Sequence, residues 1–146
     1  MSAIVLSTIG YESATLDAVI GKLKGAGVDI VVDVRAVASS RRAGFSKTLL
    51  GASLGEAGIG YRHLRALGTP KPGRQAARAG RIEEMHAIYH EHLASPEAQL
   101  ALEEACEIAS AHRAALLCYE ADVRHCHRAI VADLIRERTG CAVMDL

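Results

Sequence analysis

Short apolar runs alternate with segments of helical periodicity, and this alternation constrains the fold more than any other feature of the chain. The runs are rich in Ile, Val, Leu and Ala and only a few residues long, which is typical of strands buried on both faces. They lie at residues 3–9, 28–34, 59–64, 114–118 and 141–146. Between most of them, apolar residues recur every three or four positions, which indicates amphipathic helices. We therefore expect a single-domain α/β three-layer sandwich with a mostly parallel, Rossmann-like sheet of about five strands.

The length and the first residues indicate the class of protein. A chain of 146 residues suits one domain, residues 1–146, with a core that needs no disulfide or metal. The first apolar run begins at Ala3 without a basic leader and stops at Ser7, so it matches neither a secretory signal nor a membrane span. The four cysteines form no CxxC pair, and reduced thiols are the usual state of such cysteines. These features predict a cytoplasmic protein with no membrane partner.

The charges are unevenly distributed along the chain. The sequence has 17 basic and 17 acidic residues, so its formal net charge is zero. From Arg35 to Arg81, however, ten bases stand against one acid, Glu56. This excess favours an anionic partner, either a small molecule or a nucleic acid, although folding can also interleave these bases with acids from the flanks. Aromatic residues make up only 3% of the chain, which argues against extensive stacking of nucleic-acid bases.

Residues 65–81 interrupt the alternation of strands and helices. This segment sustains no helical period and carries five bases without an acid. Its glycines and prolines are Gly68, Pro70, Pro72, Gly73 and Gly80. The composition predicts a long basic loop, and loops of this length in compact domains are usually functional or mobile.

The carboxyl ends of the predicted strands are the expected place for a ligand, because open parallel sheets bind ligands there. Tyr11 follows the first strand, and Asp33 and Arg35 end the second. A basic group then precedes a predicted helix: Arg35, Arg41, Arg42 and Lys47. Arginine forks suit phosphate or carboxylate, so these residues are predicted to bind an anion. The basic side chains of the long loop, including Arg74 and Arg78, either extend this contact or stay in solvent.

The turn after the fourth strand holds the candidate catalytic residues, Glu120 and Cys126. A helix N-terminus and neighbouring cations favour a thiolate, so Cys126 is predicted to be a nucleophile or redox group, unless it is a small buried residue that locks the turn. Glu120 can act as a general base, or it can hold an arginine and tie two strand ends together, as Asp33 can. His127 and Arg128 are predicted to join the anion-binding group.

The turn after the fourth predicted strand also contains weak matches to the sequence patterns of metal sites and phosphatases. The ligand types of a metal site are present in Cys118, Glu120, His125, Cys126 and His127. Their spacing lacks the regular gaps of structural zinc sites. Cys118 and Arg124 match the Cys-x5-Arg spacing of phosphatases, but acids inside that loop would repel a phosphate. His86 and His90 lie one helical turn apart with no evident third ligand. No metal and no cofactor are therefore predicted.

Short motifs spread over nearly the whole chain match those of a known family. They are Thr8-Ile9-Gly10-Tyr11, Asp33-Val34-Arg35, Ser40-Arg41-Arg42-Ala43-Gly44-Phe45, Tyr61-Arg62-His63-Leu64 with Leu67-Gly68, Leu117-Cys118-Tyr119-Glu120 and Cys126-His127-Arg128. In these motifs the sequence resembles the bacterial domain of unknown function 488 family. The resemblance implies an α/β domain and draws attention to the same positions. One departure is Ala38, where the family pattern has proline.

These observations lead to two hypotheses of different classes. The first is an enzyme, a hydrolase or transferase, that acts on a phosphate-bearing substrate such as a nucleotide or nucleic acid, with Glu120 or Cys126 in the reaction. The second is a non-catalytic module that binds an anion or a nucleic acid, in which these two residues only brace the turn. A thiol or metal sensor ranks after both.

Overall fold

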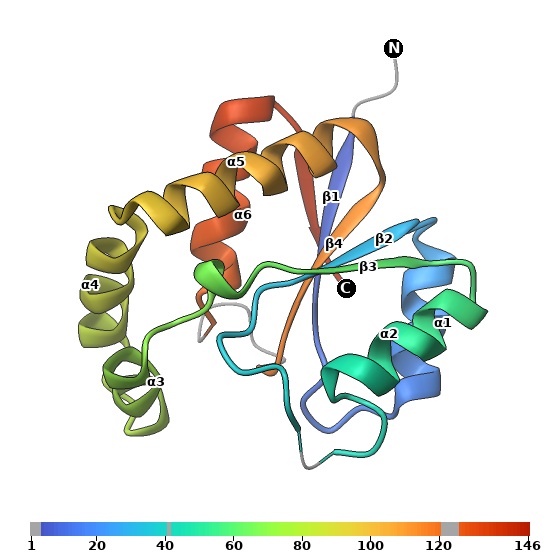
Figure 1. Cartoon of the computed structure of the whole chain (residues 1–146), viewed down its shortest axis with the longest axis horizontal. Coiled ribbons are helices and arrows are strands. Elements are labelled where there is room, and N and C mark those ends of the chain that lie inside the picture. Colours follow the sequence, from blue (N-terminus) through green and yellow to red (C-terminus); the bar gives the residue numbers. More distant parts are fainter. Residues whose placement is uncertain (1–3, 41, 121–125) are drawn as a thin grey trace.

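The computed structural model describes residues 4–40, 42–120 and 126–146 (Figure 1). The strands are β1 (Val5–Gly10), β2 (Ile30–Asp33), β3 (Gly60–His63), β4 (Ala114–Cys118) and β5 (Ala142–Asp145). The helices are α1 (Leu16–Gly25), α2 (Lys47–Glu56), α3 (Lys71–Arg78), α4 (Ile82–Leu93), α5 (Pro96–Ala111) and α6 (Arg128–Thr139), with a short 3-10 helix η1 (Arg65–Leu67) before α3. Each of the five apolar runs contains one strand, so the predicted α/β fold is confirmed.

The sheet is parallel throughout, with the strand order β3-β2-β4-β1-β5. The strands β1 and β2 follow each other in the chain, yet β4 lies between them. In the register, Thr8 of β1 is opposite Leu116, and Val32 of β2 is opposite the same residue from the other side. The strand β4 is therefore buried within the sheet, which explains why all five of its residues are buried.

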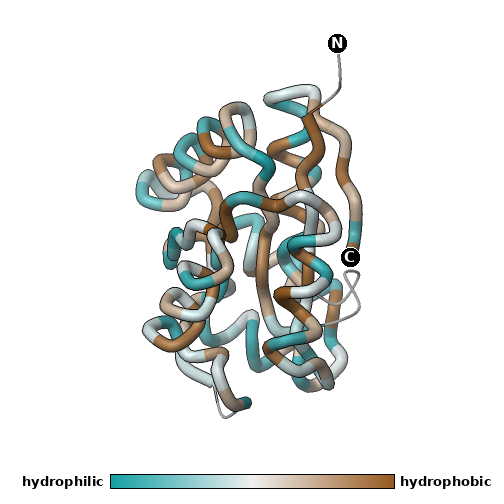
Figure 2. The backbone as a smooth tube through the Cα atoms, turned by 90° about the vertical axis from the view of Figure 1, so that its right-hand side faces the viewer, coloured by the Kyte–Doolittle hydropathy of each residue, from teal (hydrophilic) through white to brown (hydrophobic). Residues whose placement is uncertain are grey.

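Helices cover both faces of the sheet, as the predicted sandwich requires. On one face, Val31 and Leu117 pack with α1 and α2. On the other face, Val32 and Leu116 pack with α4, α5 and α6. Because successive residues of a strand point to opposite faces, one apolar run supplies both cores. Figure 2 shows the mainly hydrophobic strands in the middle of the molecule.

The connections leave the centre of the sheet in opposite directions. From β1 the chain passes through α1 to β2, and from β4 it passes through α6 to β5. These two helices lie on opposite faces. The carboxyl ends of β1 and β4 therefore form a topological switch point, where open α/β sheets leave a crevice for a ligand.

Helix ends follow local rules that are visible in the sequence. Thr15 caps α1, because its hydroxyl accepts a hydrogen bond from the Ala18 amide at 3.1 Å. Ser95 caps α5 in the same way, with Pro96 in the first turn. Gly140 ends α6 in the left-handed conformation, with φ of 74°.

The prediction of a long loop over residues 65–81 is wrong, because this segment forms η1 and α3. Proline in the first turn fits the start of α3, and Gly73 and Ala76 are buried on its inner side. A Cβ on Gly73 would lie 2.5 Å from the Thr69 side chain and 3.3 Å from Ile88, so the helix packs closely. Two small residues supply most of this buried face, which is too weak an apolar pattern to reveal a helix in sequence.

Among the described residues, no helix has the length and apolar character that crossing a membrane requires.

Gly68 allows the segment before α3 to contact the segment that follows β2. A Cβ built on Gly68 would lie 2.2 Å from the backbone of Ala36, which follows β2. We predict that Gly68→Ala lowers the free energy of unfolding by about 1–3 kcal/mol, because the backbone has to move to relieve the overlap. Urea denaturation measures the change.

Gly21→Ala is the matched control for this substitution. Gly21 lies inside α1, and a Cβ there meets nothing within 4 Å. We expect this variant to be as stable as the wild type or up to about 1 kcal/mol more stable, because alanine is the better helix former. Equal effects of the two substitutions would contradict the close approach at Gly68.

Candidate functional site

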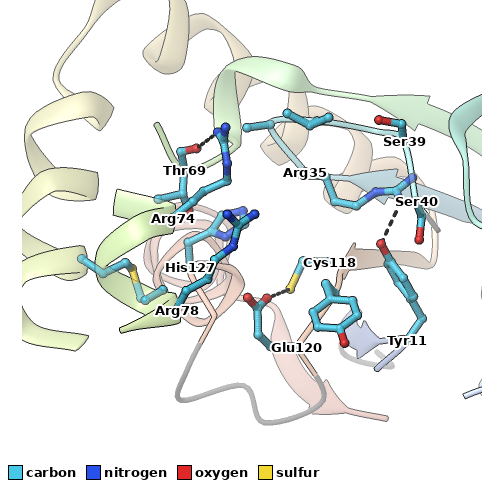
Figure 3. A pocket seen from close by; sticks show the side chains of 15 residues that line it. Tyr11, Arg35, Ser39, Ser40, Thr69, Arg74, Arg78, Cys118, Glu120 and His127 are labelled. Carbon is cyan, nitrogen blue, oxygen red and sulfur yellow. Dashed lines mark hydrogen bonds between the residues drawn. The ribbon is translucent and has the colours of Figure 1, made fainter. Parts of the chain in front are cut away.

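A cavity of about 460 Å³ opens at the carboxyl ends of the central strands (Figure 3). Its wall combines the loops after β1, β2 and β4 with the start of α6 and one side of α3. The lining residues are Tyr11, Arg35, Ala36, Val37, Ser39, Ser40, Thr69, Arg74, Ala77, Arg78, Met85, Cys118, Tyr119, Glu120 and His127. The cavity therefore lies at the switch point of the sheet, and its volume is in the range of small-molecule sites.

A buried ion pair between Asp33 and Arg35 forms the side of the cavity beneath the loop after β2. Asp33 is fully buried, and Arg35 Nη2 donates to its Oδ2 at 2.7 Å while Nε donates to Oδ1 at 2.9 Å. The other arginine nitrogen, Nη1, donates to the Tyr11 hydroxyl at 3.1 Å and to the Phe45 carbonyl at 2.7 Å. Tyr61 donates its hydroxyl to Asp33 Oδ2 at 2.5 Å. This network joins the residues at the ends of β1 and β2, a residue of β3 and the loop before α2.

The surroundings of this ion pair favour its charged form. Burial lowers the pKa of Arg35, but the hydrogen bonds and the charge of Asp33 raise it by more, so the net shift is upward. Burial and the contact with Asp33 raise the pKa of Tyr61, which keeps that hydroxyl a donor. Most of the hydrogen-bonding capacity of Arg35 is thus used inside the protein. Arg35 is therefore a part of the cavity wall, where its hydrogen bonds position Tyr11 and Phe45.

We predict that Asp33→Asn lowers the free energy of unfolding by about 3–5 kcal/mol, because it leaves the buried charge of Arg35 without its counterion. Chemical denaturation at neutral pH measures the change. Asp29→Asn is the control: this exposed carboxylate lies just before β2, and its loss should change stability by about 0.5 kcal/mol or less. Similar effects of the two variants would show that the buried pair does not hold the cavity wall.

Two arginines of α3 form the cationic wall of the cavity. Arg74 and Arg78 are one helical turn apart, and both line the cavity. Arg74 is half-buried and donates Nη1 to the Thr69 carbonyl at 2.8 Å, which orients its guanidinium. Arg78 is exposed at the mouth, and its charge acts on Glu120. Figure 3 shows both side chains on the α3 side of the cavity, with Arg74 turned toward Thr69.

Cys118 and Cys126 are joined by a disulfide, with their sulfur atoms 2.09 Å apart. This corrects the expectation that all four cysteines are reduced thiols; Cys106 and Cys141 are the free ones. The chain folds back after β4, so the start of α6 lies beside the end of the strand, and no CxxC motif is needed for the pairing. Cys118 lines the cavity and Cys126 does not, although each cysteine has only 1% of its surface exposed.

His127 is fixed in one orientation by the backbone of β2. Its Nε2 lies 2.7 Å from the Val34 carbonyl oxygen, which only accepts hydrogen bonds, so Nε2 carries the proton. Nδ1 then has a lone pair and lies 3.7 Å from Cys126 Sγ. Burial lowers the pKa of His127 to about 4, so the ring is neutral at pH 7.

Arg128 and Glu120 complete the turn. Arg128 is buried and donates Nη1 to Cys118 Sγ at 3.0 Å and to the carbonyl of Glu120. The Glu120 carboxylate lines the cavity, with Oε2 3.6 Å from Cys118 Sγ. Burial raises the pKa of Glu120, and the backbone and Arg128 oppose this shift.

Most of the predicted site residues lie together at this end of the sheet. Those that line the cavity are Tyr11, Arg35, Glu120 and His127, with Asp33, Cys126 and Arg128 directly behind them. Arg42 lines a separate hollow next to α1, and Lys47 is exposed at the start of α2. Arg41 and His125 lie outside the described residues.

The cavity also contains residues that were not predicted as site residues. Ser39, Ser40 and Thr69 line it without any sequence motif that marks them. Arg74 and Arg78 had a visible signal, since they belong to the run of bases without an acid, but the segment was interpreted as a loop. A helical interpretation would have placed both arginines on one face.

Comparison with protein families gives one result that covers most of the chain. Residues 15–135 match the family described as Domain of unknown function DUF488. Comparisons with curated proteins and with solved structures give no match.

Proposed function

The chain belongs to the DUF488 family, and we propose that it is an enzyme that acts on a small phosphate-bearing substrate of the nucleotide class in the cavity described above. The observation that carries this proposal is the pair of arginines on α3. Arg74 and Arg78 face a cavity at the switch point of the sheet, where the ligands of open α/β proteins bind.

The charge around the cavity supports an anionic ligand. The positive charge of Arg35 is balanced by Asp33, while Arg74 and Arg78 are held near the opening. Glu120 is the acidic residue among the described lining residues. Two guanidinium groups one turn apart can bind a phosphate with several charge-assisted hydrogen bonds. Ser39, Ser40 and Thr69 provide further polar groups along the wall.

The opposite side of the cavity supports a reaction at the β4 end. A substrate held by the α3 arginines extends toward Cys118, Glu120 and His127, which line the floor. Glu120 can touch such a substrate directly. Cys126, the other candidate catalytic residue, reaches it only through Cys118, because it is buried behind that residue. Glu120 is therefore the better candidate for a catalytic residue.

We predict that Arg74→Ala and Arg78→Ala each weaken binding of a nucleoside monophosphate by about 10–100-fold, the loss expected when a hydrogen bond to a charged group is removed. Isothermal titration calorimetry at low ionic strength measures the affinity, and inorganic phosphate serves as a second probe. Arg81→Ala is the control, because Arg81 follows the same helix but pairs with Glu84 and does not line the cavity. Equal losses in all three variants would indicate non-specific attraction.

A second prediction separates catalysis from binding. Glu120→Gln keeps the shape of the side chain and removes its charge, so we expect binding of the nucleotide within about 10-fold of the wild type and loss of turnover by at least about 100-fold. Turnover is measured by chromatography over a panel of nucleotides and phosphate esters. Wild-type protein that binds these compounds and converts none of them would favour the non-catalytic binding module.

A further inference from the structure

The end of β4 and the start of α6 bring together four side chains with metal-binding chemistry, three at the floor of the cavity and Cys126 behind them: Cys118, Glu120, Cys126 and His127. The ligand atoms of the first three all lie within 4.8 Å of one another. Cys126 Sγ is 3.7 Å from His127 Nδ1, and Cys118 Sγ is 3.6 Å from Glu120 Oε2. In a tetrahedral site with bonds of about 2.0–2.3 Å, neighbouring ligand atoms are about 3.3–3.8 Å apart. Both measured distances fit that geometry.

The orientation of His127 is the one that a metal ligand needs. Histidines that bind metals usually donate their second ring nitrogen to a carboxylate or a backbone carbonyl, which fixes the tautomer. The Nε2 atom of His127 has such a partner in the Val34 carbonyl, at 2.7 Å. Its Nδ1 lone pair is therefore directed to Cys126, and both side chains are buried.

The backbone spacing of the two cysteines also suits a bridging cation. Their Cα atoms are 7.4 Å apart, wider than the roughly 4.4–6.8 Å that disulfides usually span. Two thiolates on a tetrahedral cation have sulfur atoms about 3.8 Å apart. The backbone of Cys118 and Cys126 thus has room for that separation once the disulfide is reduced.

A divalent cation would offset the negative charge of its ligands. Two thiolates and the Glu120 carboxylate carry negative charge, and burying such charge without a positive partner is costly. Arg128 Nη1 lies 3.0 Å from Cys118 Sγ, where it can donate to a metal-bound thiolate.

From these contacts we propose that the reduced protein binds Zn²⁺, or another borderline divalent cation, through Cys118, Cys126, His127 and Glu120. Thiolate and imidazole ligands in a compact site favour such ions over Mg²⁺ or Ca²⁺. This proposal differs from the interpretation of the sequence, in which the irregular spacing of the candidate ligands predicted no metal site. The site goes beyond the proposed function, although three of its ligands also line the cavity.

The disulfide must first be reduced, and a phosphine provides the electrons. One tris(2-carboxyethyl)phosphine and one water convert the disulfide to two thiols and a phosphine oxide, so sulfur gains two electrons and phosphorus loses them. Each thiol then releases a proton when its sulfur binds the cation. The reduced chain has four free thiols, of which Cys106 and Cys141 belong to neither the disulfide nor the proposed site.

The test titrates reduced, tag-free protein with Co²⁺ as a spectroscopic probe and then with Zn²⁺ as a competitor. We expect saturation at one ion per chain, a thiolate-to-cobalt charge-transfer band, and displacement by Zn²⁺. Loss of a residue that only hydrogen-bonds to a metal ligand lowers metal affinity by roughly 10–100-fold, and we expect Cys126→Ser to lower the affinity for Co²⁺ by more than this. Cys126 does not itself line the cavity, and nucleotide binding measured on the same variant is a separate readout that reports on the proposed function.

Cys141→Ser is the matched control, because Cys141 is also buried but free, and it should bind Co²⁺ as the wild type does. The oxidised wild type provides a comparison that needs no substitution: it should show no thiolate-to-cobalt band. The proposal is overturned if folded, fully reduced wild type gives no such band. It is equally overturned if oxidised protein or Cys126→Ser binds as tightly as reduced wild type, or if reduction unfolds the chain.

Discussion

The buried ion pair of Asp33 and Arg35 is the interaction on which the rest of the cavity depends. A carboxylate and a guanidinium are stable inside a protein only when their hydrogen-bonding groups find partners. Tyr61, Tyr11 and the Phe45 carbonyl provide those partners. Each comes from a different segment, so satisfying one pair of charges fixes the relative positions of the loops after β1 and β2, the strand β3 and the entry to α2.

The arginines around the cavity differ in how their charges are paired. Arg35 is buried, and its charge is matched within the protein by Asp33. The charge available to a ligand under the proposed function comes instead from Arg74 and Arg78 of α3, which line the cavity. The Gly68 contact with the Ala36 backbone connects these two regions, since it seats the segment before α3 against the loop after β2. The ion pair thus shapes the wall, and α3 places two arginines along it.

The turn from β4 to α6 has the same character, with polar groups buried because each meets a partner. His127 binds the backbone of β2 through the Val34 carbonyl, close to the Asp33 pair. Arg128 binds both Cys118 and the carbonyl of Glu120. A disulfide, an imidazole and a carboxylate thus lie close together at the carboxyl end of β4. This concentration of buried polar groups is unusual for a purely structural turn and agrees with a chemical role.

The sequence by itself determined the strands, the helices other than α3, and the end of the sheet where the cavity lies. Apolar runs of β-branched and aliphatic residues identified the strands, and Ser95 with Pro96 marked a helix start, because these signals depend on neighbours in the chain. The rule that ligands bind at the carboxyl ends of parallel strands was enough to bring Asp33, Glu120 and Cys126 into one region.

Only the tertiary structure decided what those residues contact. The placement of β4 between β1 and β2, the disulfide of Cys118 and Cys126, and the contacts of Tyr11 and Tyr61 with the Asp33–Arg35 pair all depend on groups that meet after folding. The helix α3 was missed because its stability comes from packing against Thr69 and Ile88, which a weakly apolar sequence does not reveal. Local patterns specify local conformation, whereas the partners of a buried charge or thiol are set by long-range packing.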